Sequence, residues 1–128
     1  MRFLIANERF LFRFGLDRAL LLIAGGLRSR GHHVTLLANR HDRAVTESAA
    51  DRVIVAPADA PSYPALDDWS ADWLDEHWSA LFAEAGEPDV VLVGGWPFFG
   101  AIARLRARGV RVAFMDCGAV PLEGMEPG

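Results

Sequence analysis

The segment GLDRALLLIAGGLRSRGHHVTLLA, residues 15–38, predicts a helix that is followed almost directly by a buried strand. Apolar residues recur at helical spacing over residues 16–30, which is typical of a helix with one buried face. Gly31 is placed to cap the end of this helix. Residues 33–37, HVTLL, are β-branched and apolar, as strands are. The segment therefore predicts the helix-to-strand half of a βαβ unit.

The pair Gly25-Gly26 lies inside this predicted helix. Each glycine weakens a helix by about 1 kcal/mol relative to alanine, so the pair predicts close packing of the helix on a sheet.

Outward from this segment, short apolar runs alternate with helical patterns along the whole chain, which predicts parallel strands joined by right-handed crossovers. The apolar first strand belongs at the centre, in the order 3-2-1-4-5 when strands are numbered along the chain. The fold class is therefore α/β, an open parallel Rossmann-like sheet with helices on both faces. The other predicted strands are residues 2–6, 52–55, 90–93 and 110–115, and the other predicted helices are residues 44–50, 69–85 and 97–108, the second capped by Asp67 or Asp68 and ended by Gly86.

Length and composition favour one domain with a real core. The chain has 128 residues, 52% of them hydrophobic, which is too many for a disordered segment. No apolar run reaches the ~18 residues of a membrane helix, and the first residues lack the pattern of a signal peptide. The single cysteine, Cys117, forms no internal disulfide. These features predict a cytoplasmic protein.

Charge is distributed unevenly along the chain. Residues 1–43 carry eight arginines against three acids, and residues 44–88 carry one arginine against ten acids, within a net charge of −4. A net acidic chain without a basic run lacks the phosphate-neutralising surface that nucleic-acid binding needs. We therefore expect no nucleic-acid partner.

The predicted strand order reverses between the first and fourth strands. Ligands of such sheets bind in the crevice at the carboxyl ends of the strands next to the reversal. The loops that reach this crevice are residues 7–15, 94–97 and 116–121.

The first of these loops reads NERFLFRFG and lacks the G-x-G-x-x-G pattern of dinucleotide binding. Gly15 lies at the start of the helix, where free N–H groups suit a phosphate, or it is only the turn into the helix. Arg9 and Arg13 either neutralise an anion or are solvated. The alternating phenylalanines Phe10, Phe12 and Phe14 either line an apolar acceptor pocket or pack against a missing partner domain.

The other two loops offer further candidates. Gly94 and Gly95 allow close backbone approach of a ligand, or form a packing turn. Trp96 either stacks on a sugar or base, or covers the core. Asp116 is a candidate general base or hydroxyl-binding residue, whereas Cys117 beside it is a poor nucleophile.

Elsewhere the sequence offers structural rather than chemical candidates. The aromatic row of the helix at residues 69–85 is more typical of a core than of a cofactor site. His32 and His33 lie at the far end of the sheet from the crevice. We find no metal motif and no Ser-His-Asp arrangement, and we expect no cofactor.

Taken together, these segments resemble the first half of GT-B-fold glycosyltransferases of the group 1 (family four) type. The stretch RGHHVTLL at residues 30–37 is similar to the family's RGHEVTVLT. PDVVLVGGW at 88–96 is similar to PDVVHxHG, and RVAFMDCGAVP at 111–121 to VVxTxHDxxP. The resemblance covers about residues 1–121.

The resemblance implies an acceptor-binding, N-terminal domain that works with a nucleotide-sugar held by a second, carboxyl-terminal domain. Donor phosphates would approach Gly15, although the family usually has two glycines there. The family histidine after the fourth strand falls at Leu92 or Gly94 and is lost. Asp116 is the polar replacement expected for the histidine after the fifth strand.

The implied partners are the donor and a sugar, lipid or small-molecule acceptor, with peripheral membrane contact as a further expectation. Residues 1–128 would then be one domain of a larger enzyme, inactive alone and without a metal. The alternatives are a stand-alone flavodoxin-like or receiver-like binding module and a non-catalytic interaction domain.

Overall fold

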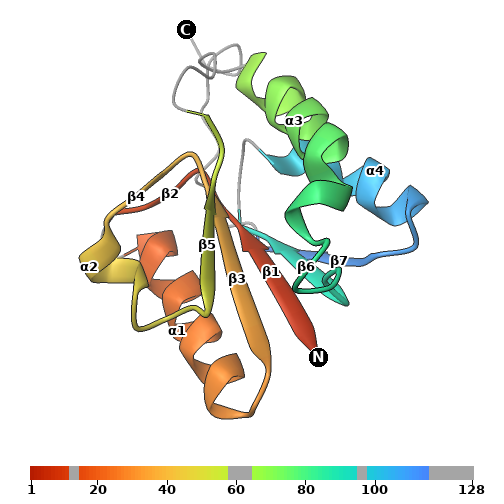
Figure 1. Ribbon diagram of the computed structural model, residues 1–128. Helices are drawn as coiled ribbons and strands as arrows, with labels where there is room; N and C mark the ends of the chain where they lie inside the picture. Colours follow the sequence, from red (N-terminus) through yellow and green to blue (C-terminus); the bar gives the residue numbers. More distant parts are fainter. Residues whose placement is uncertain (12–14, 58–64, 95–97, 116–128) are drawn as a thin grey trace, which may run out of the picture.

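A computed structural model describes residues 1–11, 15–57, 65–94 and 98–115 of the chain, with the side chains of residues 65–68 excepted. Five parallel strands form one open sheet in the order β5-β3-β1-β6-β7 (Figure 1). This order confirms the predicted 3-2-1-4-5. The strands are β1 (Arg2–Ala6), β3 (His33–Ala38), β5 (Arg52–Val55), β6 (Val90–Val93) and β7 (Arg111–Phe114).

Helices cover both faces of this sheet, as predicted. In Figure 1, α1 (Gly15–Ser29) and α2 (Arg43–Thr46) lie on one side, and α3 (Ala65–Leu81) and α4 (Ile102–Ala107) lie on the other. A 3₁₀ turn, η1 (Phe98–Ala101), leads into α4. No helix in the described ranges is long and apolar enough to span a membrane.

The central strand β1 divides the core into two layers. Leu4 packs in the layer that includes Leu74 and Trp78 of α3, whereas Ile5 packs in the layer that includes Leu20 of α1. Leu4 and Ile5 are both fully buried. Successive side chains of a strand point to opposite faces, so a near-continuous apolar strand serves both layers.

A second, two-stranded parallel sheet was not predicted. It pairs β2 (Arg9–Phe10) with β4 (Arg40–His41), beyond the carboxyl ends of β1 and β3. Strands of two residues carry no periodicity that a sequence pattern can register. Phe10, expected to line a pocket or meet a partner domain, is fully buried in the α1 layer.

Gly31 ends α1 as predicted. Its φ is +87°, its N–H donates to the Arg28 carbonyl at 2.9 Å, and the His32 N–H donates to the Leu27 carbonyl at 3.1 Å. This pattern is a Schellman cap, which favours glycine at the left-handed position.

The start of α3 differs from the prediction. The helix begins at Ala65 rather than near Trp69, so Asp67 and Asp68 lie inside its first turn and are not its caps. The helix ends at Leu81, and four turn residues separate it from Gly86, whose φ is +89°.

The prediction for Gly25 and Gly26 was wrong. A Cβ at either position would meet no neighbouring group within 4 Å, so these glycines are not where α1 packs on the sheet. A Cβ at Gly94, in contrast, would clash with the Leu20 side chain of α1. Close approach of helix and sheet therefore depends on the glycine after β6.

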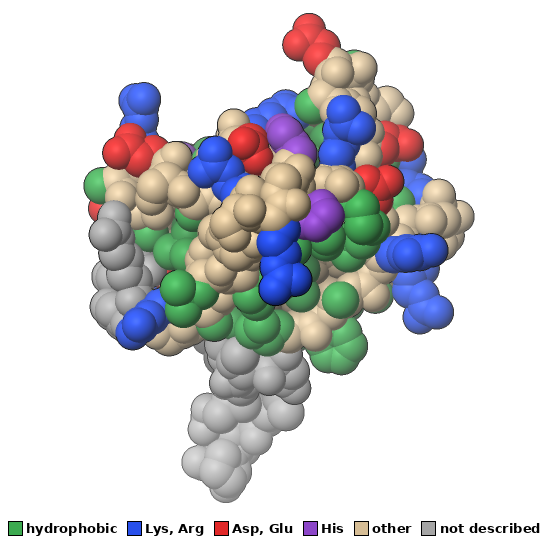
Figure 2. All heavy atoms as spheres, turned by 90° about the horizontal axis from the view of Figure 1, so that it is seen from below, with side chains coloured by type: hydrophobic (Ala, Val, Ile, Leu, Met, Phe, Trp, Pro, Cys, Tyr) green, Lys and Arg blue, Asp and Glu red, His purple; other side chains and the backbone are tan. Residues whose placement is uncertain are grey.

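Hydrogen bonds and an ion pair link the segments at the amino-terminal end of the sheet. Figure 2, which views the molecule from this end, shows arginine, acidic and histidine side chains interspersed around apolar surface. His32 contacts the Met1 amino group at 3.0 Å and the Phe3 ring at 5.2 Å. This places His32 in a structural contact far from the predicted crevice.

Asp51 makes the main polar link at the same end. Its carboxylate accepts the Val34 N–H at 2.8 Å and pairs with Arg28 at 3.2 Å. The backbone hydrogen bond from Val34, followed by the Arg28 charge, outweighs desolvation and lowers the pKa of Asp51 below its usual 3.8.

Candidate functional site

The carboxyl ends of the central strands meet at the predicted crevice. The Gly94 N–H donates to the Ala6 carbonyl at 2.8 Å, and the Asn7 N–H donates to the Leu37 carbonyl at 3.0 Å. The chain therefore leaves β1 and β6 side by side, at the point where the strand order reverses. Of the predicted site residues, Gly15 and Gly94 are described, whereas Phe12, Arg13, Phe14, Gly95, Trp96 and Asp116 lie outside the described residues.

Gly15 opens the 15-residue helix α1 with φ at +63°. It is exposed, and a Cβ there would meet nothing within 4 Å. The left-handed backbone explains the glycine, because other residues adopt that conformation at a cost. The space on the Cβ side of Gly15 is open, and the first turn of a helix carries N–H groups that suit an anion.

Asp17 organises the loop that precedes α1, and the sequence analysis missed it. Its side chain is 6% exposed and accepts the Leu11 N–H at 3.2 Å. The Asn7 amide also donates to it at 3.4 Å and to the Arg9 carbonyl at 2.7 Å. An acid in the first turn of a helix, where it complements the helix dipole, was the signal available in the sequence.

Arg9 is held beside this carboxylate rather than fully solvated. Its Nε lies 3.8 Å from Asp17 Oδ2, while its side chain stays 44% exposed. The neighbouring strand brings Arg40 into register with Arg9, and Arg40 pairs with Glu8 at 3.1 Å. Two partly exposed guanidinium groups thus border the loop after β1.

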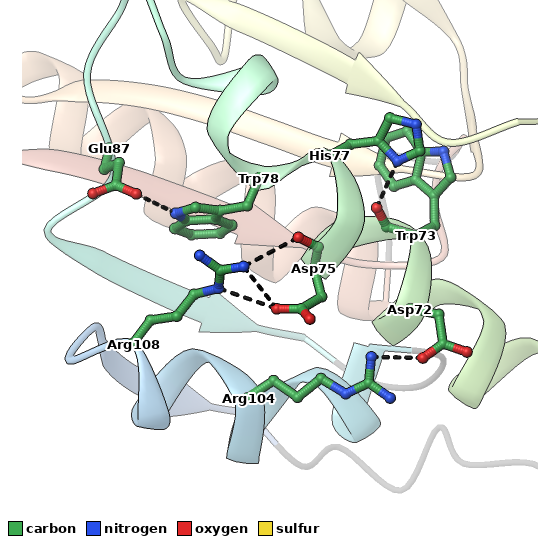
Figure 3. Close-up of polar contacts among 8 residues, drawn as sticks. All are labelled: Asp72, Trp73, Asp75, His77, Trp78, Glu87, Arg104 and Arg108. Atoms are coloured by element: carbon green, nitrogen blue, oxygen red, sulfur yellow. Dashed lines mark hydrogen bonds and ion pairs between the residues drawn. The ribbon is translucent and has the colours of Figure 1, made fainter.

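Beyond β6, the described chain resumes at η1, which leads into α4. Figure 3 shows Arg104 of α4 and Arg108, the C-cap residue of α4, reaching Asp72 and Asp75 of α3. The two ion pairs measure 2.6 and 2.8 Å. The Arg108 guanidinium also lies 5.7 Å from the Trp78 ring centroid. These contacts hold α4 against α3, and η1, which begins at Phe98, leads directly into α4.

The aromatic row of α3 serves mainly as core, as the sequence predicted. Trp78 and Phe82 are buried and meet edge to face at 4.8 Å, and the Trp78 indole donates to Glu87. Trp73 and His77 are partly exposed and stack on each other at 4.9 Å (Figure 3).

Two cavities lined by described residues lie away from the carboxyl ends of β1 and β6. An apolar groove of about 320 Å³ runs between α1 and α2 and includes Leu21, Leu22 and Val45 in its lining. A polar hollow of about 420 Å³ lies at the amino-terminal end, near Met1 and Asp89. Residues 1–11, 15–57, 65–94 and 98–115 contain no cluster of three or more metal-ligating side chains.

Comparison with known proteins gives one family and a set of similar folds. The profile of the family described as "Glycosyl transferase 4-like domain" matches residues 14–120. No curated protein matches the chain significantly.

Two similar solved structures are of the C-terminal domain of a Pyrococcus furiosus hydrogenase. Both are 20% identical to this chain. The alignment with the first covers 89% of this chain and 90% of the hydrogenase domain, with a TM-score of 0.61. The alignment with the second covers 88% of this chain and 89% of the hydrogenase domain, with a TM-score of 0.58. A third structure, the glycotransferase of kitacinnamycin, is 24% identical with a TM-score of 0.57, over 88% of this chain and 29% of its own. At these identities the structures establish a common fold.

Proposed function

The chain belongs to the glycosyl transferase 4-like domain family, and from this premise we propose that it is the acceptor-binding half of a glycosyltransferase that uses a nucleotide-sugar donor. Gly15 carries the proposal. It opens a long helix near the reversal of the strand order, with open space where a side chain would lie. That arrangement suits the phosphates of a nucleotide-sugar.

The division of labour is also part of the proposal. The chain corresponds to 29% of the similar glycotransferase, so a second domain is expected to hold the nucleotide. The domain formed by residues 1–128 would bind the acceptor and form one side of the cleft between the two domains. The partly exposed Arg9, held by Asp17, would add positive charge near the diphosphate.

The proposed chemistry is displacement at the anomeric carbon of the donor sugar. A hydroxyl oxygen of the acceptor forms the new C–O bond, the bond to the diphosphate breaks, and the nucleoside diphosphate leaves. Asp116 is the residue we propose to take the acceptor proton, since a carboxylate at a strand's carboxyl end suits a general base. Replacing Asp116 with alanine should impair transfer more than folding.

The stand-alone flavodoxin-like or interaction module is not favoured, because the family match covers most of the chain. We first measure the intact mass of the protein from its native source, so that the assay uses the chain at its native length. That protein is incubated with a panel of nucleotide-sugars and acceptors, and release of nucleoside diphosphate is measured.

Gly15→Val is the decisive variant in this assay. We expect it to lower turnover at least about a hundredfold, because a branched side chain at a left-handed residue disturbs the start of α1. Gly26→Val is the matched control on the exposed side of the same helix, where a Cβ also meets nothing. Equal turnover in Gly15→Val and wild type would contradict the phosphate role.

A further inference from the structure

An exposed leucine lies at the rim of the apolar groove between α1 and α2. Leu22 lines this groove and is 65% exposed, whereas Leu21 and Val45, which also line it, are less accessible. A single exposed leucine is common on protein surfaces, but this one adjoins a hollow of about 320 Å³ that no described residue fills. The face therefore carries a protruding apolar side chain and a recess next to each other.

Gly25 forms part of the recess. It lies inside α1, three residues after Leu22, so both residues are on the same face of the helix. A Cβ at Gly25 would meet no group within 4 Å, so packing within the described parts of the chain does not account for the glycine. A glycine inside a helix costs about 0.5–1 kcal/mol relative to alanine. A side chain from another molecule, seated where the Cβ would lie, would account for it.

The groove carries opposite charges at its two ends. Arg18 lines it near the start of α1, is exposed, and forms no ion pair with the residues that the structure describes. Glu47, the C-cap residue of α2, lies at the other end, because Arg28 in the last turn of α1 donates to the adjacent Ser48 carbonyl at 3.0 Å. The Glu47 side chain is 65% exposed, and its ion pair with Arg43 is 4.0 Å long. Both charges are therefore accessible to a partner.

We propose that this groove is the interface of a symmetric dimer, in which a second copy of the chain supplies the side chain that fills the recess. A two-fold axis through the middle of the groove exchanges its ends, so a face with opposite charges at its two ends complements itself. Leu22 of each copy enters the recess at Gly25 of the other copy, and Arg18 of each copy lies beside Glu47 of the other. The groove lies away from the carboxyl ends of β1 and β6, so dimerisation is independent of the proposed function.

The spacing of these residues along α1 agrees with such a dimer. The two-fold axis makes the two α1 helices antiparallel, and a contact between Leu22 and Gly25 then places Arg18 opposite Ser29 of the other copy. Ser29 ends α1, and Arg28 beside it holds the segment that follows Glu47. The carbonyl end of a helix also favours a cation. The register that seats Leu22 therefore also brings Arg18 to the end of the groove where Glu47 lies.

The first test is the mass of the native-length chain in solution, measured by sedimentation equilibrium from about 1 to 200 µM protein. We expect a dimer at the highest concentration and dissociation on dilution, because one groove per copy makes a small interface. Leu22→Glu should weaken association at least about tenfold, since a carboxylate would enter an apolar recess. A monomer at every concentration, or a dimer that Leu22→Glu leaves unchanged, would overturn the proposal.

Phe114→Glu is the matched control for Leu22→Glu. It introduces the same charge at another exposed apolar residue, which is 62% exposed and belongs to the edge strand β7. Its association constant should equal that of wild type, with circular dichroism used to verify that both variants are folded. Equal weakening by the two variants would show a general effect of charge and would overturn the proposal.

The second test reverses the two groove charges separately and together. Arg18→Glu and Glu47→Arg should each weaken association, because each places like charges opposite one another across the interface. The double variant restores an opposite pair and should recover most of the lost affinity. Arg106→Glu makes the same change of charge on α4, on the other face of the sheet, and should leave association unchanged. A double variant that recovers none of the affinity would overturn the proposal.

Discussion

Two arginine–carboxylate networks of this molecule differ in a way that distance alone does not predict. At the start of α1, Arg9 and Asp17 are 3.8 Å apart, and the Asp17 side chain is 6% exposed. Between α3 and α4, Arg108 and Asp75 are 2.8 Å apart, and the Asp75 side chain is 43% exposed. The pair with the longer distance contains the more deeply buried carboxylate, although Arg9 is 44% exposed and Arg108 is 35% exposed.

The comparison indicates that the buried carboxylate contributes more to the fold. Exposed ion pairs are screened by water and salt and contribute little, whatever their length. Asp17 also fixes backbone and side-chain groups of the loop after β1, which lose their partner if the carboxylate is removed. Asp51, with a side chain 31% exposed, lies between these extremes and also accepts a backbone N–H.

The largest expected effect is that of Asp17→Ala. We predict a loss of about 3 kcal/mol in the free energy of unfolding, because the Leu11 N–H and the Asn7 amide lose a buried acceptor and Arg9 loses this charged partner. Chemical denaturation measures this loss. Asp17→Asn retains one acceptor oxygen and should lose less. A loss smaller than that of Asp75→Ala would contradict the conclusion that the buried carboxylate contributes more to the fold.

Asp51→Ala should have an intermediate effect, about 1.5 kcal/mol at pH 7, and the effect should depend on pH. The folded-state pKa of Asp51 is lowered, so its stabilisation is present above the unfolded-state pKa and is lost as the pH falls through the folded-state value. The difference between wild type and Asp51→Ala should therefore shrink as the pH falls from about 5 to below about 4. Urea unfolding across this range checks the sign. A difference that grows on acidification would contradict the assignment.

The smallest effect should be that of Asp75→Ala, about 0.5–1 kcal/mol. High salt should reduce the difference from wild type, because both partners are partly exposed. Asp72→Ala, at the other exposed pair of the α3–α4 contact, is the matched control and should behave alike. A loss near that of Asp17→Ala would show that the Arg108 contact with Trp78 depends on Asp75, and would weaken the burial argument.

Much of the fold followed from local patterns. The apolar runs at residues 52–55 and 90–93 correspond to β5 and β6 in full. The alternation of strands and helices, with an apolar first strand, predicted the strand order and hence the point where that order reverses. Less of the site followed, since Asp17 was missed and the roles of Asp116 and Trp96 stay predictions.

What the sequence determined by itself is the periodicity of each element and the special backbone of Gly31, because both depend on neighbours a few residues away. Only the tertiary structure decided which glycine α1 packs on, since Gly94 meets Leu20 across 74 positions of the chain. The same holds for the polar groups of the crevice. Whether an amide such as that of Asn7 finds a partner depends on strands brought together from distant segments, and no local pattern carries that information.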